Sequence, residues 1–211
     1  MRTLFTILIL SLGLRMSVAS AQNANVSDPA ETIFIEHGTA TFVASTNMPG
    51  VTVKGKSEAL HARVRMRRVT RGVALDSVEA SLPVKTLATG IALRDQHMRH
   101  YVFTTSAGEV PDLRFEVASA FCPGVLAGRE VTCKVSGNLS IRGVPRSFSM
   151  TLKIREANAA SAFRVGGDGV VKLSDYGIEP PSQFGVKTAN EIQIHLEVTE
   201  TTATAGTLSA K

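Results

Sequence analysis

The segment Leu60-His61-Ala62-Arg63-Val64-Arg65-Met66-Arg67 decides the fold class, because apolar residues alternate along it with basic or polar ones. Successive side chains of a β-strand point to opposite faces of the sheet, so a period of two predicts a strand with one buried face. The buried row of this strand contains Leu60, Ala62, Val64 and Met66.

Seven more segments repeat this alternation, and turns that contain Gly, Pro, Asn or Asp separate them. Their apolar rows lie in residues 40–44, 78–84, 113–121, 131–141, 148–154, 163–173 and 192–198. Strands with one apolar and one polar face are typical of antiparallel sheets. They build either a sandwich or a barrel, and the alternation itself does not choose between the two. Within 163–173, the run Gly166-Gly167-Asp168-Gly169 predicts a bulge or bend.

The alternation stops at Thr89-Gly90-Ile91-Ala92-Leu93-Arg94-Asp95-Gln96-His97-Met98, where polar and charged residues crowd into a short insert. This stretch resembles the signature of the YceI-like family of secreted lipid-binding barrels, Thr-Gly followed by Arg-Asp-x-His-Leu/Met. Two further segments are similar to motifs of that family in the same order, Ser136-Gly137-Asn138-Leu139-Ser140-Ile141-Arg142-Gly143-Val144 and Ser174-Asp175-Tyr176-Gly177-Ile178.

The resemblance covers residues 31–200, which we expect to form one domain. It implies an all-β fold, a single antiparallel eight-stranded lipocalin-like barrel with a short helical insert around residues 84–100. Residues 32–55 match the family only loosely, so the resemblance leaves the identity of the ligand open.

Both ends of the chain differ from the alternating region. Arg2, an apolar run over residues 4–14 and Ala19-Ser20-Ala21 predict a signal peptide over residues 1–21, with cleavage near Ala21. We therefore expect a periplasmic or secreted protein. Residues 22–30 and 201–211 are polar and aperiodic, which predicts a disordered leader and a disordered tail.

The two cysteines, Cys122 and Cys133, flank a turn that contains Pro123 and Gly124. An exported protein can keep a disulfide, and a hairpin would bring the two residues close together. Cys133 falls on the apolar row of its strand, but Cys122 follows Phe121 and falls on the opposite row, which requires a bulge for the two side chains to meet. The sequence therefore leaves the bridge open.

A binding function follows from the barrel. An eight-stranded barrel is filled by its side chains or holds one small ligand. Many inward residues here are Ala, Val or Leu, and the chain has no Trp, which favours an apolar cavity. The resemblance implies a polyisoprenoid or an isoprenoid quinone-like lipid as the ligand, with no other cofactor. The residues expected to contact it are Phe42, Val64, Met66, Leu82, Phe115, Leu139, Phe148, Met150, Leu152, Phe163, Ile192, Ile194 and Leu196.

No catalytic motif stands out, since the chain has no Gly-x-Ser-x-Gly elbow, and we do not expect an enzyme. We interpret Arg94, Asp95 and His97 as organisers of the barrel mouth, with contact to a ligand head group as a secondary hypothesis. An alternative is a metal- or haem-associated enzyme that uses these residues with His100, although we expect no metal site. A third reading is a filled scaffold that acts through its surface.

The charge of the chain and the placement of its arginines indicate which partners other than the lipid to expect. The formal net charge is +5, and five arginines, Arg63, Arg65, Arg67, Arg68 and Arg71, lie close together. A solvated face is the simpler interpretation of this row, and transient contact with an anionic membrane is the alternative. Nucleic acid is not expected, because no aromatic residues interleave with the arginines to stack on bases. A homodimer is left open.

Overall fold

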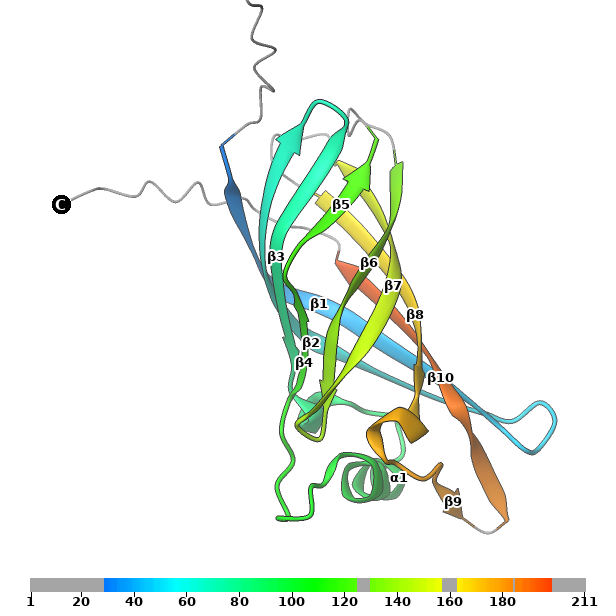
Figure 1. The fold of residues 1–211 in the computed structure, drawn as a ribbon. Helices are drawn as coiled ribbons and strands as arrows, with labels where there is room; N and C mark the ends of the chain where they lie inside the picture. Colours follow the sequence, from blue (N-terminus) through cyan, green and yellow to red (C-terminus); the bar gives the residue numbers. More distant parts are fainter. Residues whose placement is uncertain (1–28, 125–129, 157–162, 184, 199–211) are drawn as a thin grey trace, which may run out of the picture.

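The computed structural model describes residues 29–124, 130–156, 163–183 and 185–198 (Figure 1). The predicted signal peptide, most of the predicted leader and the predicted tail lie outside these residues. Ten strands occur in the described part: β1 (Glu31–Thr46), β2 (Thr52–Val69), β3 (Gly72–Leu82), β4 (Leu113–Val117), β5 (Ala120–Pro123), β6 (Glu130–Ile141), β7 (Val144–Glu156), β8 (Phe163–Lys172), β9 (Ser182–Gln183) and β10 (Val186–Val198).

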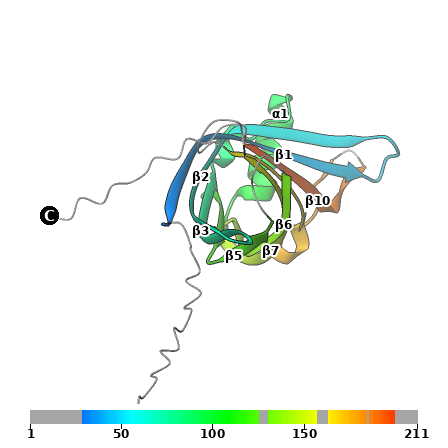
Figure 2. The same ribbon diagram turned by 90° about the horizontal axis from the view of Figure 1, so that it is seen from above.

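The sheet closes on itself, as the view along its axis shows (Figure 2). Each neighbouring pair is antiparallel, and β1 pairs with β10 to complete the ring. The short strands β4 and β5 both pair with β3 and together occupy one position, while β9 pairs only with the start of β10. The prediction of a closed eight-stranded antiparallel barrel is therefore confirmed.

The interior of the barrel is divided into two halves. At the end that holds the β2–β3 turn, ten buried residues form a filled core, which we call the closed-end cluster: Ile33, Met66, Val73, Leu75, Val117, Cys122, Val131, Cys133, Val135 and Ile154. A second cluster occupies the other half and continues into the helical insert. Burial of apolar side chains is the dominant favourable contribution in both halves.

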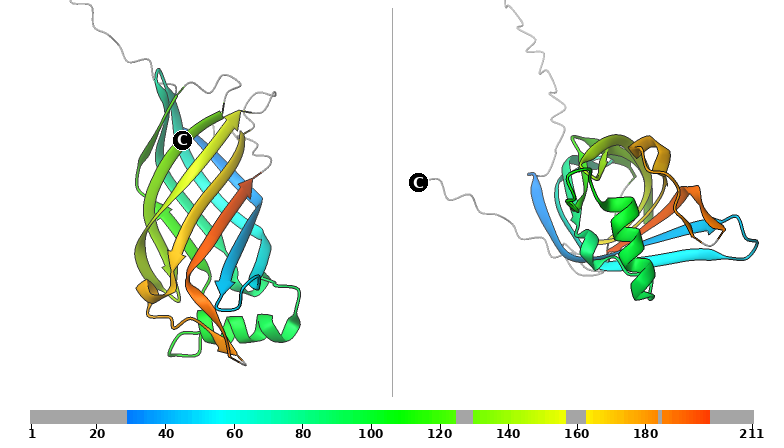
Figure 3. Two further views of the ribbon diagram at one scale, coloured as in Figure 1. Left: turned by 90° about the vertical axis from the view of Figure 1, so that its right-hand side faces the viewer. Right: turned by 90° about the horizontal axis from the view of Figure 1, so that it is seen from below.

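The helical insert lies at this second end, where α1 crosses the barrel opening (Figure 3). It contains the 3-10 turn η1 (Val84–Thr86), α1 (Ala92–Met98) and the π-helical turn η2 (Arg99–Phe103), so it continues three residues beyond the predicted end. Another 3-10 turn, η3 (Leu173–Tyr176), follows β8 at the same end. The insert is anchored on β2, because Lys56 and Ala88 exchange backbone hydrogen bonds of 2.9 Å and the hydroxyls of Ser57 and Thr86 lie 2.6 Å apart.

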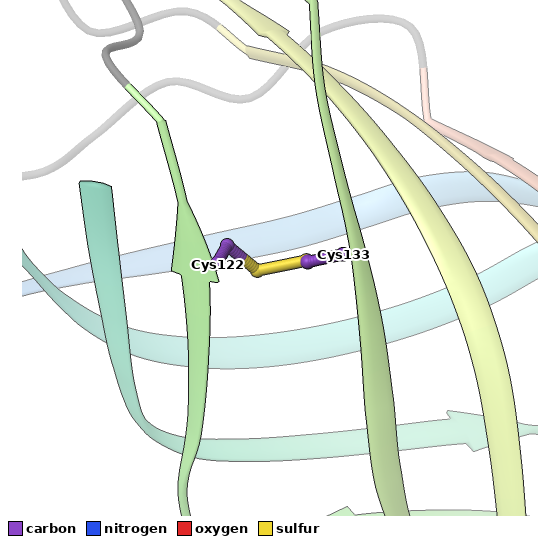
Figure 4. Close-up of a disulfide and its surroundings, with 2 residues drawn as sticks. All are labelled: Cys122 and Cys133. Carbon is purple, nitrogen blue, oxygen red and sulfur yellow. A yellow bond between two sulfur atoms is a disulfide. The ribbon is translucent and has the colours of Figure 1, made fainter. Parts of the chain in front are cut away.

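Cys122 and Cys133 form a disulfide between β5 and β6, with Cα atoms 5.0 Å apart (Figure 4). The side-chain alternation shifts by one residue between β4 and β5, at Ala118 and Ser119. Val117 and Cys122 therefore both face the core, and Phe121 is half exposed. The assignment of Phe121 to the buried row was wrong because the break between the two strands was read as a single interruption.

The predicted bulge or bend in the glycine-rich run is also wrong, because β8 pairs with β7 and β10 without a register shift. Gly167 and Gly169 occupy the inward row between Val165 and Val171. A Cβ atom on Gly169 would lie 2.5 Å from Cζ of Phe148, and one on Gly167 would lie 3.0 Å from Cδ2 of Leu152. Close approach of neighbouring side chains, and not strand geometry, is therefore what requires glycine here.

Candidate functional site

A cavity of about 920 Å³ occupies the half of the barrel beneath the insert. All eight barrel positions contribute to its wall, together with the insert and the segment that leads into β10. Its volume is near the upper end of the range of about 300–1,000 Å³ for ligand pockets. The wall is mainly apolar, so the cavity suits an apolar ligand.

Nine of the thirteen predicted contact residues line this cavity: Phe42, Leu82, Phe115, Leu139, Phe148, Met150, Ile192, Ile194 and Leu196. Val64, Met66 and Leu152 do not line it, although they are on the inward row. Met66 belongs to the closed-end cluster, and Val64 and Leu152 pack against it. The side chain of Phe163 lies outside the part of the chain that the structure describes. For these twelve described residues, alternation gave the correct face of the strand, but not the depth along the barrel.

Aromatic rings and glycines shape the cavity together. The rings of Phe115 and Phe148 meet edge to face, with centroids 5.7 Å apart and an interplanar angle of 84°. The Phe148 ring lies against Gly169, and the Phe42 ring lies against Gly55 in the neighbouring strand. Because glycine has no side chain, each ring approaches the backbone of the neighbouring strand more closely than a Cβ atom would allow.

A network around Asp95 fixes the turn that precedes α1. The carboxylate of Asp95 is buried and accepts hydrogen bonds from the backbone N–H of Thr89, at 2.8 Å, and from the Thr89 hydroxyl. Arg94 Nε donates to the same hydroxyl and Arg94 Nη2 donates to the Thr89 carbonyl, both at 2.8 Å. These bonds join α1 to the turn at Thr89, and the role of Arg94 and Asp95 as organisers of the mouth stays a prediction.

His97 faces the opposite wall of the mouth. Its Nδ1 lies 3.4 Å from Oε1 of Gln183 on β9, and its ring meets Tyr101 edge on, with centroids 5.9 Å apart. The rings of His100 and Tyr101 also meet edge to face, with centroids 4.9 Å apart. His97 therefore joins the insert to the segment that leads into β10.

Basic and acidic side chains are confined to the opening of the cavity. The lining contains three such side chains, Arg94, His97 and Glu179, and all three come from the insert or from the segment before β9. Next to this opening, burial and the carboxylate of Asp175 raise the pKa of Tyr176 to about 12, so its phenol stays neutral. The deeper wall offers a ligand no ionic partner.

Sequence reasoning missed several parts of the lining, and two of them show what the sequence could and could not reveal. One consists of Tyr101, Val102 and Phe103 in η2, whose apolar run directly after the motif was an available signal. The other is the segment 179–183 with Val186 and Thr188. That segment contains Pro180 and Pro181 and has no alternation, so its sequence gave no sign of a wall position.

Four of the five arginines lie on β2, in its half away from the mouth, and Arg71 follows in the β2–β3 turn at the closed end. Arg67 forms a bidentate pair with Asp76, with Nη2 2.9 Å from Oδ1, and Arg68 Nη1 lies 3.3 Å from Glu31 Oε1. The hydrogen bonds from Arg67 lower the pKa of Asp76. This row is therefore remote from the opening of the cavity.

The alternative metal function lacks a set of ligands in the described residues. No three His, Cys, Asp or Glu side chains in that part of the chain are grouped closely enough to hold a metal ion. Nor does any helix there have the length and apolarity needed to cross a membrane.

Comparison with known proteins agrees with this geometry. The family model of the YceI-like domain matches residues 32–199. A polyisoprenoid-binding domain from Saccharophagus degradans, implicated in plant cell wall breakdown, is 18% identical and superposes with a TM-score of 0.57, covering 83% of this chain and 100% of that one.

Two further solved structures share the fold. BcnA of Burkholderia cenocepacia is 16% identical with a TM-score of 0.56, and the match covers 78% of this chain and 96% of that chain. The YceI protein of Campylobacter jejuni is 18% identical with a TM-score of 0.51, and the match covers 75% of this chain and 88% of that chain. Among curated proteins, no sequence relative matches this chain significantly.

Proposed function

Because the chain belongs to the YceI-like domain family, we propose that it is a carrier that encloses the chain of a long apolar lipid, a polyisoprenoid or an isoprenoid quinone, inside its barrel. The observation that carries this proposal is the apolar cavity of about 920 Å³, which opens beside the insert. One structural neighbour is itself described as a polyisoprenoid-binding domain, which supports this choice of ligand.

The physical chemistry of the wall favours a hydrocarbon chain. Each buried methylene contributes about 0.8 kcal/mol of transfer free energy, so a long chain gains a large gross driving force. The loss of chain freedom offsets part of this gain. A polar or ionic chain would lose its hydration without a partner, because the charged lining residues lie only at the opening.

The placement of the basic and acidic lining residues at the opening, above a mainly apolar wall, also sets the orientation of the lipid. We expect the tail to point toward the closed-end cluster and the polar head to remain at the mouth, near Arg94 and His97. Two N–H groups of Arg94 donate hydrogen bonds to Thr89, and its remaining N–H groups are available to donate to a head group.

We favour a binding protein over an enzyme, because the polar residues of the mouth already have structural partners. Asp95 is buried and hydrogen-bonded to Thr89, so it is poorly placed to act as a base. Export is part of the proposal and rests on the signal-like residues 1–21. The matching location is the periplasm or the exterior, and a homodimer is compatible with this role.

The test has two steps. The protein is purified from its own host, extracted with organic solvent, and the extract is analysed by mass spectrometry, where we expect a polyisoprenoid lipid. Uptake of a purified polyprenol is then compared for Phe148→Asp and Ser147→Asp, whose side chains point into and out of the barrel on the same strand.

Phe148→Asp should abolish uptake because it places an unpaired carboxylate in the apolar wall, whereas Ser147→Asp should retain it. Circular dichroism establishes that both variants are folded. A wild-type protein that yields no lipid and takes up no polyprenol would overturn the proposal.

A further inference from the structure

Exposed apolar side chains gather at one end of the molecule. Nine large hydrophobic residues are exposed in the described part of the chain, and six of them lie at the end where the cavity opens. We call these six the mouth rim: Met48 and Val51 in the β1–β2 turn, Ile91, Leu93 and Tyr101 in the insert, and Val110 in the loop before β4. Leu93 and Tyr101 are 59% and 63% exposed.

The rim is continuous with the cavity. Val51 and Tyr101 are both exposed to solvent and part of the cavity lining, so the apolar surface passes from the wall onto the outside of the molecule. The β1–β2 turn, α1 and β9 extend to the same end (Figures 1 and 3). Exposed apolar residues that gather at one end and adjoin a cavity mark an interaction site more often than singly scattered ones do.

The charges around the rim are mainly basic. In residues 84–103 the basic side chains are Lys85, Arg94 and Arg99, and the only acidic one, Asp95, is buried. Over all segments at this end (residues 44–56, 83–112, 142–146 and 173–188), eight basic residues face five acidic ones. Basic groups beside exposed apolar groups fit a surface that is anionic outside and apolar beneath, as an anionic bilayer is.

We propose that the protein docks mouth-first on an anionic phospholipid bilayer, with the mouth rim at the boundary between head groups and acyl chains. This inference rests on the proposed lipid-carrier function, because it gives the route by which a tail would pass between the membrane and the cavity without crossing water. It also places the docking surface on the insert and the β1–β2 turn, and not on the arginine row of β2.

The experiment measures flotation of the protein with two kinds of vesicle, phosphatidylcholine alone and phosphatidylcholine with phosphatidylglycerol. Leu93→Asp tests the rim, and Phe121→Asp is the matched control. Phe121 is also half exposed, but it lies on β5 at the closed end, so both variants replace an exposed apolar residue with a carboxylate. Neither residue lines the cavity.

We expect wild type and Phe121→Asp to bind the anionic vesicles equally, and binding to fall as salt is raised. Leu93→Asp should bind about tenfold more weakly, because it removes apolar contact and adds repulsion. Equal binding to both vesicle types, equal loss in both variants, or no flotation would overturn the inference. Dissociation of a wild-type dimer by Leu93→Asp would also overturn it, since the rim would then be a self-interface.

A parallel measurement separates this inference from the carrier function. Each protein is titrated in solution, without vesicles, with farnesol delivered from ethanol. Farnesol binding by wild type without flotation would refute only the docking surface. Flotation without farnesol binding would refute the carrier function and leave the docking surface supported by the vesicle data alone.

Discussion

Ala40→Trp should shorten the cavity from its inner end. Ala40 is buried, and of the β1 residues that line the cavity it is the one nearest along the strand to Ile33 of the closed-end cluster. An indole at this position projects into the space that the end of a long tail would occupy. Affinity for long polyprenols should therefore fall more than affinity for short ones.

The size of the effect follows from the displaced chain. An indole takes the place of about four methylenes, at about 0.8 kcal/mol each, which gives a loss of about 3 kcal/mol. Because 1.4 kcal/mol corresponds to a factor of ten, solanesol should bind about a hundredfold more weakly. Farnesol does not need the inner end of a cavity of about 920 Å³, so its affinity should change less than about threefold.

The assay is a competition between farnesol and solanesol for the protein, read by native mass spectrometry. Ala118→Trp is the control, because Ala118 is exposed between β4 and β5 and the indole there has no access to the cavity. The chain has no natural Trp, so the fluorescence of the new indole also reports whether it meets ligand. An equal loss for both alcohols, or no loss for solanesol, would refute the threading of a tail toward the closed end.

Three further predictions concern stability and the insert. Replacement of Cys122 and Cys133 by Ala removes a link across 11 residues and should lower the free energy of unfolding by about 2–3 kcal/mol. Calorimetry should show a melting temperature lower by about 5–10 °C, while farnesol binding is retained. An unchanged melting temperature would contradict this expectation. The folded pKa of Tyr176, about 12, lies above the ordinary value of 10.0. The stability that this phenol contributes is therefore complete below pH 10 and is lost as the pH rises toward 12, and Tyr176→Phe should reduce the alkaline fall in denaturation experiments by about 1–2 kcal/mol. Asp95→Asn removes a buried carboxylate that accepts two hydrogen bonds from Thr89. Amide hydrogen exchange in residues 84–103 and the dissociation of farnesol should therefore both become faster. Asp112→Asn, at an exposed site, should change neither rate.

Periodicity was sufficient to locate the barrel strands, because each of them has one face toward solvent and one face toward the interior. All eight apolar rows correspond to strands, and the stop in the pattern at Thr89 marks the insert. Closure could not be predicted in the same way, since a sandwich requires the same alternation, and it was the motifs that indicated a barrel.

The depth of a side chain along the barrel was not available from the sequence. Met66 and Met150 have the same chemistry and both face inward, yet one fills the closed end and the other lines the cavity. Their difference depends on strand tilt and register, which arise only when the ring is complete. The pairing of Cys122 with Cys133 was hidden for a related reason, because the break at Ala118 and Ser119 reverses the alternation between β4 and β5.

The two halves of the barrel can respond differently to mutation. The closed-end cluster holds the disulfide and a dense set of buried side chains, so it stabilises the fold without contributing to the cavity lining. The walls near the insert enclose empty space, where exchanging one hydrophobic residue for another of different bulk alters the bore more than it disturbs the packing. Substitutions that change the bulk of lining residues in the hollow half should therefore alter which ligands the cavity accepts, while the filled half keeps the barrel folded.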